Sequence, residues 1–200
     1  FQASLTTSVC LLPLAVAPIG YGILLEHIPP KRLLVAGLCG LALCEAGQGL
    51  VPSFSLFLGL RFVQGLIIPG LFTAMMTLIA TVCADNKAGL QRTMALYVAF
   101  TIFGGFFSRF ASGGLATLFH WRVSFLALAG LILLAAFMAL RLPPGEQKTT
   151  PERFRWHHFS LLARRELLTA YGVAFCIFFV FAGTLNFLPF RLHDLAQGPL

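Results

Sequence analysis

The sequence predicts an all-α protein built as a bundle of membrane-spanning helices, and three observations predict it. Hydrophobic residues make up 58% of the chain and charged residues only 10%, whereas soluble domains carry about 25% charged residues. The apolar residues gather in runs, each near the roughly 20 residues that a helix needs to cross the hydrocarbon core of a bilayer. Lysine and arginine fall mainly between these runs, which is typical of membrane proteins.

Six runs qualify as spans, and all are expected to be helical because lipid offers no partner for open backbone groups. Pro13, Pro18 and Pro69 lie inside spans and are expected to kink them. The connection after the fifth span is long, charged and contains Pro143-Pro144-Gly145, which indicates a linker. We therefore expect a first bundle over residues 1–141, a linker over 142–166 and the start of a second bundle over 167–200. The expected spans are about 4–25, 33–51, 54–83, 93–118, 123–141 and 167–190.

The basic residues indicate which side of the membrane each loop lies on. The net charge of +7 does not point to nucleic acid, because the basic residues are not gathered on one amphipathic face. Ten of the fourteen lysine and arginine residues lie in the loops 26–32, 84–92 and 141–166. The intervening turns, at 52–53 and 120–122, hold only Arg122. This excess of basic residues on alternate loops predicts that the loops 26–32, 84–92 and 141–166 are cytoplasmic.

No pattern in the sequence indicates an enzyme, a metal site or a bound cofactor. The five cysteines form no C-x-x-C pair and are interpreted as small packing residues within helices. His157-His158 has no cysteine nearby and few carboxylates. The chain contains no H-E-x-x-H and no P-loop, so an ion gradient is the expected energy source. The cysteines are Cys10, Cys39, Cys44, Cys83 and Cys176.

The turn after the first span carries the first family motif. Its sequence is Gly22-x-x-x-Glu26-His27-x-Pro29-Pro30-Lys31-Arg32. It resembles the turn between helices two and three of the major facilitator superfamily, where G-x-x-x-D-R-x-G-R-R/K-R is usual. Glu26 keeps the charge of the aspartate, His27 replaces a basic residue and Pro29 replaces glycine.

Three further motifs follow in the order of that family. Arg61-Phe62-Val63-Gln64-Gly65 matches the R-x-x-Q-G signature of helix four. The segment from Gly104 to Gly114 occupies the place of the helix-five signature, with Gly113-Gly114 matching its closing glycines. His120-Trp121-Arg122 stands before helix six, where many members carry Trp-Arg. The form Ser108-Arg109-x-x-Ser112-Gly113, followed by Trp121-Arg122, resembles that of a bacterial branch usually described as drug or sugar efflux carriers.

The resemblance covers nearly the whole chain as helices two to seven of twelve. It implies a partial chain of a multi-pass transporter in a bacterial inner membrane, which carries a small molecule by alternating access. Proton-coupled efflux is the favoured activity. Nutrient uptake by the same machinery and a non-transporting scaffold or receptor remain alternatives. The resemblance also implies that Gly22, Glu26, His27, Lys31 and Arg32 form a cytoplasmic gate. Oligomeric state is unknown, with a monomer expected.

Arg61 is the first candidate for substrate binding or proton coupling. An arginine within an apolar helix costs about 2.5 kcal/mol or more, so it is expected to face protein or water. A structural role, in which it reaches the interface or satisfies helix-end carbonyls, is the alternative. Glu45 lies as far before Ser53 as Arg61 lies after it, so neighbouring antiparallel helices would put both at one depth. We expect the two to pair unless Glu45 is protonated.

Arg109 is the second candidate and lies within a run of small residues. Gly104, Ser108 and Ser112 are spaced by four, as are Gly105, Arg109 and Gly113; Gly114 extends the set. Small residues at this period let two helix backbones approach closely. The pattern indicates either static packing or a seam along which two halves slide. Gln64, Tyr97 and Asn186 are further polar groups in spans that contact substrate or cross-link helices.

Overall fold

The computed structural model describes residues 2–142 and ten helical positions between 169 and 184. The chain divides into one unit over residues 1–151 and a second over 152–200, and the boundary falls inside the expected linker 142–166. The first unit contains five helices, and within the described residues no strand occurs. All five are long and apolar enough to cross a membrane, so the predicted all-α fold class is confirmed.

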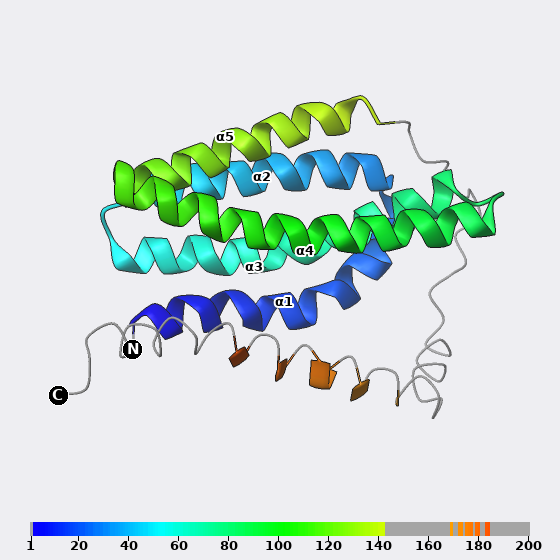
Figure 1. Ribbon diagram of the computed structural model, residues 1–200, viewed down its shortest axis with the longest axis horizontal. Coiled ribbons are helices and arrows are strands. Elements are labelled where there is room, and N and C mark those ends of the chain that lie inside the picture. The colour runs from blue at the N-terminus through cyan, green and yellow to red at the C-terminus, as the bar shows by residue number, and fades with distance from the viewer. Residues whose placement is uncertain are drawn as a thin grey trace. The chain divides into compact units, whose positions relative to one another are not determined.

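The helices follow one another through short turns and alternate in direction (Figure 1). Each begins or ends a few residues away from the expected span, most of all α4, which starts at Lys87 rather than near residue 93. The helices are α1 (Gln2–His27), α2 (Pro30–Leu50), α3 (Phe54–Val82), α4 (Lys87–Leu118) and α5 (Trp121–Leu140).

Capping explains why α4 begins before its apolar stretch. The side chain of Asn86 accepts a hydrogen bond from the backbone N–H of Gly89 at 2.9 Å, which satisfies one of the free donors of the first turn. The segment from Lys87 to Arg92, which carries two basic residues and Gln91, therefore extends the helix beyond the hydrocarbon-length run. At the other turns, Pro30 occupies the first position of α2 and His120 Nδ1 accepts from the Arg122 N–H of α5.

Helices α2 and α3 are central to the packing, because α2 lies against α3 and α5, and α3 also lies against α1. Helix α4 rests mainly on α5 and is exposed along most of its length. The buried apolar cluster Leu34, Ala74, Leu78 and Ala139 joins α2, α3 and α5. It lies toward the end of the bundle that carries the loops at 28–29 and 83–86 (Figure 1).

Helices α1 and α3 pack closely at two glycines of α3. A Cβ atom on Gly65 would lie 2.3 Å from the carbonyl oxygen of Cys10 and 2.6 Å from Cγ of Pro13. A Cβ atom on Gly70 would lie 2.5 Å from the ring of Tyr21. Small residues thus let these helices approach, as is common in membrane bundles. By contrast, nothing described lies within 4 Å of a Cβ built on Gly104, Gly105, Gly113 or Gly114.

Lys31 ties the start of α2 to the end of α5. Its Nζ donates a hydrogen bond to the carbonyl oxygen of Leu142, one of the acceptors that a helix end leaves free. We expect Lys31→Met to lower the free energy of unfolding by roughly 1 kcal/mol, since the bond is charge-assisted but partly exposed. Thermal melting in detergent measures this. Arg32→Met, which changes the exposed neighbour, should melt within error of wild type, and an equal loss in both variants would contradict the specific role of Lys31.

Candidate functional site

A cavity of about 430 Å³ lies between α3, α4 and α5. Helix α3 contributes Arg61. Helix α4 contributes Arg109, Ser112 and Gly113, and α5 contributes Trp121, Ser124, Phe125 and Leu128. The volume falls in the range of about 300–1,000 Å³ that is usual for small-molecule sites. The lining residues bear two positive charges and no acidic group.

Aromatic rings and an amide hold the Arg61 side chain. Its guanidinium lies 5.5 Å from the centre of the Phe57 ring and 5.6 Å from that of Phe125. These two rings meet edge to face at 5.9 Å, and Trp121 stands edge to face against Phe125 at 6.1 Å. Nη1 of Arg61 also donates to Oε1 of Gln64 at 3.2 Å. Cation–π contacts of this kind stabilise a charge that has left water.

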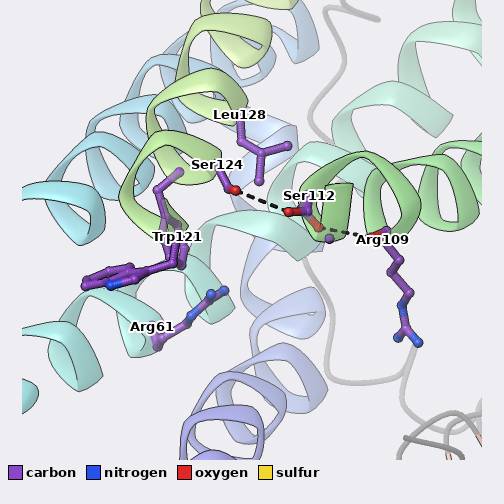
Figure 2. A pocket seen from close by; sticks show the side chains of 8 residues that line it. Arg61, Arg109, Ser112, Trp121, Ser124 and Leu128 are labelled. Carbon is purple, nitrogen blue, oxygen red and sulfur yellow. Dashed lines mark hydrogen bonds between the residues drawn. The ribbon is translucent and has the colours of Figure 1, made fainter. Parts of the chain in front are cut away.

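Serine hydroxyls form hydrogen bonds in the cavity wall where α4 meets α5. Ser124 Oγ donates to the carbonyl oxygen of Ser112 at 3.2 Å, and Ser112 Oγ donates to the carbonyl oxygen of Arg109 at 3.3 Å. Figure 2 shows both bonds, with Arg61 reaching toward them from α3. The Arg109 side chain extends away from Ser124 in the same view, so the two guanidinium groups occupy different parts of the site.

Helices α2 and α3, which pack on each other, carry further buried polar groups. The Glu45 carboxyl group of α2 lies within electrostatic range of the Arg61 charge and near the Gln64 side chain, both on α3. Oε2 of Glu45 is nevertheless buried without a hydrogen-bond partner, as are both amide atoms of Gln48 and Nε2 of Gln64. Gln48 and Gln64 are the most deeply buried polar side chains described, at 0% and 1% exposure. Direct pairing of Glu45 with Arg61 stays a prediction.

Buried amides without partners cost about 1–3 kcal/mol each, so we expect Gln48→Met to raise the melting temperature. A methionine of similar shape removes both unpartnered atoms. If the amide serves transport, the same variant should also lose activity, because functional groups often persist at a cost in stability. Melting and transport are measured side by side. A lower melting temperature would mean that Gln48 is satisfied in the native protein and that this interpretation is wrong.

The remaining sequence candidates fall outside this cavity. Gly22, Glu26, His27 and Arg32 are exposed at the α1–α2 turn, and Lys31 is half-buried there. Nδ1 of His27 lies 3.2 Å from the carbonyl oxygen of Ile23, one helical turn earlier. The phenol oxygen of Tyr97 is buried without a hydrogen-bond partner. Asn186 lies outside the described residues.

Sequence reasoning missed part of the site. Gln48 lies three residues after Glu45 on the same helix, and that spacing was the available signal. Phe57 and Phe125 could not be predicted from the sequence, because a chain with 21 phenylalanines does not show which rings face Arg61. Leu128 could not be predicted either, because nothing in the sequence marks it as a cavity residue.

These features define a polytopic membrane protein with an arginine-lined cavity between three of its helices. The family model described as Major Facilitator Superfamily matches residues 1–198, and the chain belongs to that family. The resemblance stated from the motifs is therefore confirmed. No solved structure gave a significant match.

Curated relatives are transporters by name. An uncharacterized transporter of Buchnera aphidicola is 22% identical over 196 residues, which cover 96% of this chain and 47% of the relative. The multidrug efflux pump LfrA of Mycolicibacterium smegmatis is 26% identical over 159 residues, covering 77% of this chain and 31% of the pump. The proposed niacin/nicotinamide transporter NiaP of Bacillus subtilis is 26% identical over 176 residues, covering 84% and 44%. The chain thus spans less than half the length of these relatives.

Proposed function

We propose that the chain forms part of a secondary active transporter that exports a small molecule by alternating access in exchange for protons. The observation that carries this proposal is the cavity of about 430 Å³ lined by Arg61 and Arg109, which lies between helices that are long and apolar enough to span a bilayer. Arginine within a membrane is costly and marks a substrate or ion pathway far more often than a passive scaffold.

The cluster around Glu45 supports coupling to protons. A carboxyl group inside a bundle can lose its charge by taking a proton, and Arg61 and Gln64 act on Glu45 from the neighbouring helix. A change of charge at Glu45 would alter the field at Arg61, which lines the cavity. Substrate binding and proton binding are thereby linked through one side chain.

Transport in inverted membrane vesicles that contain the full-length protein tests the proposal. Substrate should accumulate when a proton gradient is imposed, and accumulation should disappear when a protonophore collapses the gradient. Accumulation that is unchanged without the gradient would contradict proton exchange. No transport in either direction would favour a scaffold or receptor.

Uptake is the second candidate, and the NiaP relative favours it, since its name describes a vitamin carrier. The LfrA relative favours efflux. Comparing inverted with right-side-out vesicles under the same inward or outward gradient decides the direction. The same comparison, combined with labelling of single cysteines in the loops 26–32 and 84–92, tests the proposed cytoplasmic location of those loops and an inner-membrane assignment.

We expect Glu45 and Arg61 to act together. Glu45→Gln and Arg61→Ala are measured singly and in combination for melting temperature and for transport. Coupled groups should show an interaction energy of about 0.5–3 kcal/mol. Strictly additive losses in both measurements would remove the pairing hypothesis.

The turn between α1 and α2 is proposed as the cytoplasmic gate, formed by Gly22, Glu26, His27, Lys31 and Arg32. The exposure of Glu26 and Arg32 leaves both charges free to meet a second bundle. The bond from Lys31 to Leu142 connects the turn to the end of α5, where the chain leaves the first bundle.

A further inference from the structure

We propose that the cavity between α3, α4 and α5 binds amphipathic organic anions, with Arg61 recognising the negative group and the neighbouring rings receiving an apolar or aromatic body. This inference rests on the proposed function and deepens it, because it names the class of substrate.

The Arg61 guanidinium is held in place with donors left over. A guanidinium offers five N–H donors, and one of them reaches Oε1 of Gln64. Among the described residues no other acceptor bonds to Arg61, and Phe57 and Phe125 pack near the group without using its donors. A guanidinium that is held in place and has unused N–H donors suits a carboxylate or sulfonate, which accepts two parallel hydrogen bonds.

The rest of the lining matches the other end of such a molecule. Trp121, Phe125 and Leu128 form an apolar wall from α5, and aromatic surfaces of this kind stack against planar ligands. Arg109 of α4 also belongs to the lining, but its side chain is exposed and extends away from Ser124 (Figure 2). The lining contains no acid that could neutralise a cation, and Glu45 lies on α2 outside the lining residues. A cationic substrate would therefore be repelled by the charge of Arg61 with no acid in the lining to offset it, whereas an anion would be attracted.

Binding of a matched pair of probes to the full-length protein in nanodiscs tests the inference. Naphthalene-2-sulfonate and naphthalene-2-sulfonamide share the ring system and differ in charge at neutral pH. Calorimetric titration without any gradient should show the sulfonate binding about 10- to 100-fold more tightly, as expected for charge-assisted hydrogen bonds. Equal affinities, or tighter binding of the sulfonamide, would overturn the proposal.

Variants show which residue causes the preference for the sulfonate over the sulfonamide. Arg61→Gln should abolish it, and Arg61→Lys, which keeps the charge but loses the planar fork, should keep part of it. Arg92→Gln changes an exposed arginine of α4 outside the cavity and should retain the full preference. A preference that survives Arg61→Gln would overturn the role of Arg61. The wild-type comparison stands even if a variant fails to fold.

The titration separates this inference from the transport proposal. Selective sulfonate binding without gradient-driven movement in vesicles would contradict the carrier and leave the anion site standing. Gradient-driven movement of the sulfonamide, with no binding of the sulfonate, would contradict the anion site and leave the carrier standing.

Discussion

Gly65→Ala is expected to destabilise the bundle by more than about 4 kcal/mol, which is exceptional for a single methyl group. The added Cβ would lie 2.3 Å from the carbonyl oxygen of Cys10. That oxygen belongs to the backbone of α1 and cannot rotate away, so the two helices must separate. The measurement is thermal melting of the purified protein, together with its yield in the membrane fraction.

Gly59→Ala is the matched control for this prediction. Gly59 lies on the same helix, is exposed, and has nothing described within 4 Å of a built Cβ. Its replacement should change stability by no more than about 1 kcal/mol. If Gly65→Ala and Gly59→Ala melt alike, α1 does not approach α3 at Cys10 and the packing described for this pair is wrong.

Gly113→Leu is expected to block transport while the protein still inserts and folds. Nothing described lies within 4 Å of a Cβ at Gly113, so the fold has room for a side chain. The residue lines the cavity beside Arg109, and a leucine there occupies space that a substrate needs. A steric conflict of about 1–3 kcal/mol in the bound state corresponds to roughly a 5- to 150-fold loss of transport.

Two further leucine variants show why transport is lost. Gly130→Leu, on an exposed position of α5 with open space around it, should transport normally. Gly105 belongs to the same run of small residues as Gly113 but does not line the cavity. Loss in both Gly105→Leu and Gly113→Leu indicates a sliding seam, whereas loss in Gly113→Leu alone indicates a filled cavity. Normal transport by Gly113→Leu contradicts both.

Hydropathy predicted the five described helices from α1 to α5 and their order, because transfer of backbone and side chains into lipid depends on composition along the chain. The sixth expected span, 167–190, lies largely outside the described residues. They did not predict which faces meet. The run from Gly104 to Gly114 has the spacing of a packing interface, yet the close contact described here is made by Gly65 and Gly70 on α3. Spacing identifies a surface that allows close approach, while the partner depends on the arrangement of the whole bundle.

The residues of the cavity were likewise predictable from the sequence only in part. Arg61 and Arg109 could be predicted because a charge inside an apolar run is conspicuous, and both line one cavity. The rings that hold Arg61 could not, since each is one phenylalanine among many. Gln48 was overlooked, and its burial without a partner is visible only in three dimensions.

Transport through the cavity requires that water reach the space beside the arginines. In a background without the native cysteines, Ser112→Cys places a thiol on the cavity wall, and Leu131→Cys places one on the outer face of α5, where leucine is 62% exposed. A membrane-impermeant methanethiosulfonate reacts only with a hydrated thiolate. The account predicts rapid labelling at position 112, slowed by naphthalene-2-sulfonate, and none at position 131. Equal inertness at both positions would mean that the cavity is dry and would contradict a transport pathway through it.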